Sequence, residues 1–269
     1  MKELEGSAMA NIVEAGKLKR VDVIVTRSKG SLLSWLIRFG TGSYWNHALM
    51  TYVIRNPDQG YDTTFIIESG GSGIDVHNIS HYLERPERYD VGIKRFEAEW
   101  FQNDQDMGGL LYRRKVRGFA LSEIDDKYDY KLILGIARRI ARQLILAFLF
   151  PWQRRKPPEQ RRIHVPGFLK RLNVNAYICS GFVQWSYYQG VSRVIEHTGD
   201  DKSKLQDVVF NPRLAGNVTE DELLSTTPAD LANSDKLAWK YIVKDGHVWE
   251  VEKGDSEDKV MSILGGRTK

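Results

Sequence analysis

The spacing of apolar positions predicts several short strands in the first hundred residues. Period-two alternation with β-branched residues, bounded by turn residues, is typical of strands. Ser31–Phe39 instead has helical spacing, with a serine placed to cap its first turn. Asn78–Leu83 is predicted as a second short helix, and SGGSG at 69–73 as a tight turn. The predicted strands are Val21–Arg27, His47–Ile54, Thr63–Glu68, Ile74–Val76 and Tyr89–Phe96.

Helical spacing dominates the middle of the chain, and strand-like alternation returns near its end. Helical patterns cover 97–123 and 131–150, and prolines then open a long basic loop at 151–174. A further helix is predicted at Cys179–Gln189. The last two strands, Trp239–Val243 and His247–Val251, flank a typical Asp-Gly hairpin turn.

This order predicts an α+β fold, with an antiparallel sheet packed against helices. Residues 1–18 are expected to be a loose or helical leader. Residues 19–269 are expected to form one domain, with a helical and basic insertion at about 97–174.

Composition narrows the classes of protein to consider. The 269 residues are 42% hydrophobic, which allows a sizeable core. The single cysteine excludes an internal disulfide and a multi-cysteine zinc site, and no cofactor is expected.

The N-terminus lacks a secretory apolar region, and no apolar run is long enough for a membrane span. We therefore expect a cytoplasmic protein. The net charge of +4 says little about partners.

Cys179 is the candidate nucleophile. A catalytic thiol needs an ionised sulfur, a base within reach and a group that orients the base. A cysteine at a helix start feels the positive end of the helix dipole and has free backbone N–H groups nearby. The alternative is a buried cysteine that acts only as a small hydrophobic residue.

Of the six histidines, His47 is the candidate base, because it opens an apolar strand directly after a polar loop. Glu68 ends the neighbouring predicted strand, where a carboxylate is costly unless it has a partner. If the two strands pair, Glu68 can orient the imidazole of His47. The alternatives are a structural histidine and a solvated turn carboxylate.

At this point the residues resemble the circularly permuted branch of the NlpC-type papain-like cysteine hydrolases, which includes the YiiX/YaeF-like proteins. In that branch the histidine precedes the cysteine. The resemblance covers a little over half of the chain and depends on the order of His47, Glu68 and Cys179. The matching segments are LKRVDVIVT at 18–26, SLLSWLIRFGTGSYWNHALMTYV at 31–53, FIIESGGSGIDVHNISHYL at 65–83, KYDY at 127–130, YICSGFVQWSYYQ at 177–189 and TTPADLANSDKLAWKYIV at 226–243.

The resemblance implies a papain-like fold and a Cys-His-Glu triad. Cys179 would attack an acyl carbonyl, His47 would carry the proton and Glu68 would fix the tautomer. The backbone amide of Cys179 would help to bind the oxyanion. A thioester would form, which water resolves in a hydrolase and an amine or alcohol in an acyl transferase. The enzyme would be a thiol amidase or peptidase, or a lipid acyl hydrolase or transferase, and the acyl substrate (small molecule, peptide or lipid) stays open.

Weaker signals surround these residues. Tyr44 and Asn46, just before His47, and Ser180, just after Cys179, are candidates for substrate binding, with ordinary packing as the alternative. His77 and His81 have the i, i+4 spacing of metal ligands on a helix, but no third ligand is apparent. We therefore expect no metal site.

The basic insertion suggests a second function. Residues 131–171 combine an apolar helical pattern with many Lys and Arg and a single acid, Glu159. Such a segment suits an anionic membrane surface, which would make the protein peripheral to a membrane. A solvated basic loop explains it equally well, and no nucleic-acid partner is expected because no known module is present. The alternative function is a catalytically inactive papain-like module that binds a membrane or a partner through this insertion.

Overall fold

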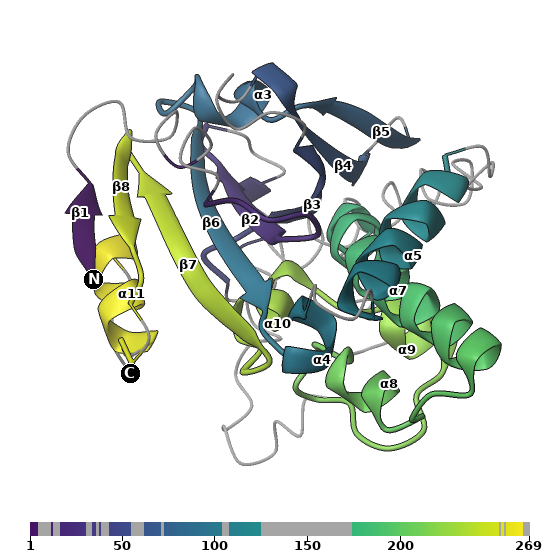
Figure 1. Cartoon of the computed structure of the whole chain (residues 1–269). Coiled ribbons are helices and arrows are strands. Elements are labelled where there is room, and N and C mark those ends of the chain that lie inside the picture. The colour runs from purple at the N-terminus through teal and green to yellow at the C-terminus, as the bar shows by residue number, and fades with distance from the viewer. Residues whose placement is uncertain are drawn as a thin grey trace, which may run out of the picture.

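The protein is seen here in a computed structural model. It describes residues 1–4, 12, 17–30, 34–35, 38, 43–54, 62–70, 73–103, 108–124, 174–252, 254–255 and 257–265. Figure 1 shows a sheet in the middle of the molecule, with most of the helices gathered against one of its faces.

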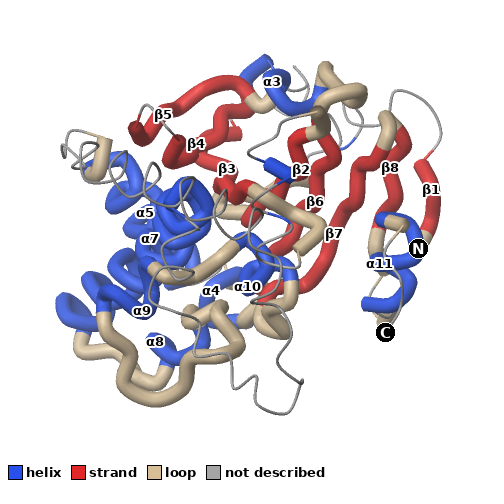
Figure 2. Tube along the Cα trace, turned by 180° about the vertical axis from the view of Figure 1, so that it is seen from behind, coloured by secondary structure: helices blue, strands red, loops and turns tan. Residues whose placement is uncertain are grey.

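The described residues form one antiparallel sheet of eight strands, in the order β1-β8-β7-β6-β2-β3-β4-β5. Figure 2 shows this sheet from behind, running from the β5 edge to the β1 edge. The expected α+β architecture is confirmed at this level. The strands are β1 (Lys2–Leu4), β2 (Val23–Ser28), β3 (His47–Ile54), β4 (Thr64–Gly70), β5 (Gly73–Asn78), β6 (Tyr89–Phe96), β7 (Leu237–Lys244) and β8 (His247–Glu250).

The helices come mainly from the middle and the last third of the chain. They are α3 (Ser80–Leu83), α4 (Glu99–Gln102), α5 (Gly108–Ser122), α7 (Val174–Thr198), α8 (Lys204–Asp207), α9 (Glu220–Leu224), α10 (Pro228–Ala232) and α11 (Glu257–Leu264). Within the part of the chain that the structure describes, no helix has both the length and the apolar character needed to span a bilayer.

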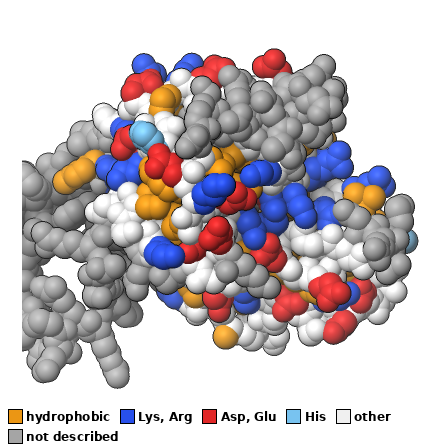
Figure 3. Space-filling view, turned by 60° about the vertical axis from the view of Figure 1, so that its left-hand side comes forward, with side chains coloured by type: hydrophobic (Ala, Val, Ile, Leu, Met, Phe, Trp, Pro, Cys, Tyr) orange, Lys and Arg blue, Asp and Glu red, His pale blue; other side chains and the backbone are white. Residues whose placement is uncertain are grey.

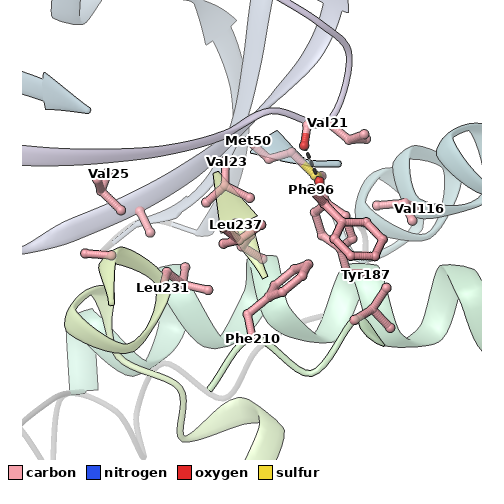
Figure 4. Close-up of a cluster of buried hydrophobic side chains, with 14 of the residues drawn as sticks. Val21, Val23, Val25, Met50, Phe96, Val116, Tyr187, Phe210, Leu231 and Leu237 are labelled. Atoms are coloured by element: carbon pink, nitrogen blue, oxygen red, sulfur yellow. Dashed lines mark hydrogen bonds between the residues drawn. The ribbon is translucent and has the colours of Figure 1, made fainter. Parts of the chain in front are cut away.

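Both faces of the central strands are buried. Along β2, Val23 and Val25 join the core between the sheet and helices α5 and α7, whereas Ile24 joins a second cluster on the opposite face. This is the alternation that a pleated strand imposes. Figure 4 shows part of the first cluster, where the hydroxyl of Tyr187 on α7 donates to the carbonyl of Val21. The bond joins α7 to the residues just before β2.

Two glycines let α7 pack closely. A Cβ at Gly190 would overlap the backbone of Val116 on α5, and one at Gly181 would overlap the carbonyl of Leu224 on α9. Close packing of α7 therefore depends on residues without side chains at both contacts.

Several sequence-based expectations need correction or fall outside the description. Lys2–Leu4, expected in a loose or helical leader, pairs with β8 as an edge strand. Helix α7 begins at Val174 and not at Cys179, since the apolar run before the cysteine is helical. The predicted helix at 131–150, the basic loop and the KYDY segment lie outside the described residues.

Candidate active site

Strand pairing brings His47 and Glu68 together. β3 and β4 pair with Met50 opposite Ile67 and Thr51 opposite Ile66. Continuing this register places Glu68 opposite Leu49, two residues from His47. Diagonal neighbours of this kind lie within reach of long side chains on the same face of a sheet.

The two side chains are in direct contact. The Nε2 atom of His47 lies 2.5 Å from Oε2 of Glu68, and the side chains are 19% and 14% exposed. An ionised carboxylate only accepts hydrogen bonds, so Nε2 carries a proton and donates it. This leaves Nδ1 as the ring nitrogen that can accept a proton from another group.

That other group is Cys179. Helix α7 packs on β3 and β4, and the side chain of Cys179 interacts with the His47 imidazole through a hydrogen bond and through charge. Burial by itself lowers the pKa of His47. The electrostatic interaction and hydrogen bond with Cys179, and then the contact with Glu68, outweigh burial and raise the pKa of His47 to about 10. The imidazole, between the Cys179 side chain and the Glu68 carboxylate, is therefore placed to remain protonated.

Glu68 is held in its ionised form. Burial raises the pKa of a carboxyl group because the charged form loses water. The hydrogen bond and charge of His47, the hydrogen bond from Tyr82 and the charge of His77 act against this effect, and lower the pKa of Glu68 to about 2. The carboxylate thus keeps its charge over the whole neutral range.

Cys179 differs from the expectation in two ways. Because α7 begins at Val174, the cysteine is the sixth helical residue. Backbone N–H groups in the second turn are bonded within the helix, and the dipole effect is largely confined to the first turn. The structure therefore does not support the expected oxyanion contact from the backbone amide of Cys179. It also does not support activation of the thiol by the start of the helix. The residue is also fully buried, with 0% exposure.

In the structure, His77 and His81 do not have the arrangement of two metal ligands on one helix. His77 lies at the end of β5 and His81 in α3, so the two are not on one helical face. Their rings meet edge to face with centroids 5.3 Å apart. Among the residues that the structure describes, no group of three or more His, Cys, Asp or Glu side chains is placed to hold a metal ion.

A pocket of about 520 Å³ opens beside Glu68. It lies on the β5 and α3 side of the carboxylate, and all of its lining residues have polar or charged side chains. The lining residues are Glu68, Asp75, His77, Asn78, Ser80, His81 and Arg85.

The three candidates for substrate binding have partners within the protein. The hydroxyl of Tyr44 donates to Asp90 at 2.6 Å, and the side-chain oxygen of Asn46 accepts from the backbone N–H of Ser28 at 2.7 Å. The hydroxyl of Ser180 donates to the carbonyl of Thr226 at 2.7 Å. Each residue thus has a structural role, and its contact with a substrate stays a prediction.

Two residues at the site were not among the sequence-based candidates for it. The hydroxyl of Tyr82 donates to Oε2 of Glu68 at 2.6 Å. Nε2 of His77 lies 3.2 Å from Oε1 of the same carboxylate. The pairing of Ile66 with His77 explains the second contact, because it makes His77 a diagonal neighbour of Glu68. Only the hairpin signal between β4 and β5 pointed toward this proximity.

Comparison with known proteins adds no relative. No protein-family model matches the chain, and no curated protein matches it at a significant level.

Proposed function

We propose that the protein is a cysteine-dependent hydrolase or acyl transferase that acts on an amide or ester bond through a thioester intermediate. The observation that carries the proposal is the position of the His47 imidazole between the Cys179 side chain and the Glu68 carboxylate. Three residues far apart in the sequence meet in the arrangement that thiol activation requires: nucleophile, base and orienting carboxylate.

The proposed reaction follows from these contacts. His47 takes the thiol proton on Nδ1, and Glu68 stabilises the imidazolium that forms. The Cys179 sulfur attacks the acyl carbon, and the imidazolium then gives its proton to the leaving amine or alcohol. Water or a second nucleophile resolves the thioester with His47 again as base. We include in this proposal the permuted papain-like fold of the NlpC type, with the antiparallel sheet, the order of the three residues and the packing of α7 as its support.

A second candidate function is a module of the same fold that binds a partner or a membrane without catalysis. The complete burial of Cys179 favours this candidate, since a nucleophile has to meet its substrate. The segment at 131–171, through which it would bind an anionic membrane, lies outside the described residues. On the face drawn in Figure 3, Lys and Arg side chains gather across the middle of the view, with Asp and Glu among and below them. That mixture gives the membrane proposal no support of its own.

The single cysteine makes a direct test possible. A thiolate absorbs in the ultraviolet where a thiol does not, and the difference between wild type and Cys179→Ala contains the signal of this residue alone. At pH 7 an ordinary thiol, with a pKa of about 8.5, is mostly protonated. We expect a thiolate signal at pH 7 in wild type and its loss in His47→Gln. The control is His247→Gln, which changes a histidine that is 64% exposed and lies in β8.

Acyl transfer is tested on the same proteins with a small activated acyl ester and intact-mass measurement. The catalytic proposal expects one acyl group on wild type, none on folded Cys179→Ala and a much slower gain in His47→Gln. A thiolate signal without acylation would favour the binding module. Absence of the thiolate at pH 7 would refute the catalytic proposal.

A further inference from the structure

Glu68 accepts two hydrogen bonds on one oxygen and lies close to His77 with the other. Oε2 accepts from Nε2 of His47 at 2.5 Å and from the hydroxyl of Tyr82 at 2.6 Å. Oε1 lies 3.2 Å from Nε2 of His77. The three groups come from β3, α3 and β5, so three different elements surround the carboxylate. The two hydrogen bonds on Oε2, from His47 and Tyr82, hold that oxygen toward the imidazole.

We propose that Tyr82 and His77 are positioning residues. They keep the Glu68 carboxylate in place and in its charged form, so that it contacts His47. This inference rests on the proposed function, because it assigns two further residues to the same site. Both residues contact Glu68 directly, so we assign their role to that carboxylate.

The packing around Tyr82 supports this role. The side chain is buried, and its ring meets those of Tyr89 and His81 edge to face, with centroids 4.9 Å and 5.0 Å apart. The position of the hydroxyl is therefore set by the core and not by solvent. Burial, followed by the nearby charge of Glu68, raises the pKa of Tyr82 well above its usual range, so the hydroxyl stays protonated and remains a donor.

The groups near Glu68 change its pKa, which can be measured. The hydrogen bond from Tyr82 and the charge of His77 both lower the pKa of Glu68. Removing either raises the pKa of Glu68 toward its ordinary value of 4.5, so the carboxylate loses its charge at a higher pH. The titratable and charged groups that face Glu68 are His47 on β3, Asp75 and His77 on β5, His81 and Tyr82 on α3, Arg85 beyond α3 and Cys179 on α7.

The test is the pH at which the thiolate absorbance of Cys179 disappears on acidification. The imidazolium and thiolate pair depends on a charged Glu68, so protonation of Glu68 weakens the pair. In Tyr82→Phe, which keeps the ring, we expect the acid midpoint to rise by about one pH unit, or about 1.4 kcal/mol. The matched control is Tyr89→Phe. It removes a hydroxyl that lies 3.4 Å from His81 and is expected to leave the midpoint unchanged.

His77 is tested by two substitutions. His77→Leu removes the contact with Oε1 and is expected to raise the midpoint in the same direction. His77→Arg keeps a positive charge at this place and is expected to restore part of the difference. A purely structural role would not distinguish the two variants in this titration once circular dichroism shows that both are folded.

The outcomes separate the two proposals. A thiolate in wild type with an unmoved midpoint in both Tyr82→Phe and His77→Leu would overturn the positioning role and leave the proposed function standing. Absence of the thiolate in wild type would overturn both. If Tyr82→Phe does not fold, the His77 pair decides alone.

Discussion

Replacing Glu68 by glutamine removes the charge of the carboxylate and keeps nearly the same shape. Its pKa is lowered from an ordinary 4.5 to about 2, by His47 first among its partners. A carboxyl group whose pKa is lowered in the folded state stabilises the fold above its unfolded pKa. This stabilisation is lost as the pH falls from about 4.5 through about 2.

The size of the effect follows from the two pKa values. At about 1.4 kcal/mol for each pH unit, they correspond to about 3 kcal/mol of stability at neutral pH. The side chain is only 14% exposed, so screening by water reduces this value little. Between about pH 5 and pH 3, wild type should lose about 2 kcal/mol of its advantage over Glu68→Gln.

Urea unfolding followed by tryptophan fluorescence, at several pH values in this range, measures the difference. The control is Asp75→Asn, because Asp75 lies opposite Glu68 in the β4–β5 pair and its side chain is 71% exposed. Its contribution is expected to be small at every pH. A difference between wild type and Glu68→Gln that does not change from pH 5 to pH 3 would refute the ion-pair reasoning.

Two further substitutions test the scaffold around the site, and denaturant unfolding measures both. Gly181→Ala places a methyl group against the carbonyl of Leu224 and should cost about 1–3 kcal/mol through overpacking, whereas an unchanged stability would show that α9 moves freely. The buried carboxylate of Asp22 accepts two hydrogen bonds of 2.7 Å from the guanidinium of Arg95. Arg95→Ala removes this ion pair and should lower the free energy of unfolding by about 3–5 kcal/mol. Recovery by Arg95→Lys should be incomplete, because an ammonium cannot form the paired contact.

The parts of the fold that follow from local pattern were predictable. Although both faces of the central strands are buried, the turn residues in the sequence mark where these strands begin and end. Asp245 and Gly246 adopt the positive φ angles of 51° and 84° that an Asp-Gly hairpin turn requires. Thr227 and Asp230 form a reciprocal cap with Pro228 between them, in the pattern that a Thr and an acidic residue three positions later favour.

The errors arose where tertiary packing overrides local preference. The aromatic and β-branched residues just before Cys179 favour a strand, but α7 continues through them from Val174. His77 and His81 have helical spacing, but a strand end and a turn separate them. The three-residue strand β1 has no pattern long enough to detect, and it forms only because β8 offers it a free edge.

His47 and Glu68 were predictable as neighbours once two adjacent strands were recognised. The contacts of Glu68 with Tyr82 and His77 were not, because they depend on the register of the β4–β5 hairpin and on where α3 begins. A shift of one residue in that register would turn His77 to the opposite face of the sheet. The sequence pattern therefore predicts the proximity of Glu68 to His47 better than it predicts the groups that surround Glu68.

The position of Cys179 changes the physical account of how the thiol would be activated. A cysteine at the first turn of a helix owes part of its acidity to the dipole, but in the second turn of α7 that help is small. Under the proposed function, activation then depends on His47. Burial strengthens the attraction between imidazolium and thiolate, and it also raises the cost of forming them. The carboxylate of Glu68, which accepts hydrogen bonds from His47 and Tyr82, offsets that cost. The same burial excludes ordinary solutes from the sulfur, so a substrate has to open a path to Cys179 before it can react. For this arrangement, access to the thiol and not its acidity would determine which acyl compounds are used.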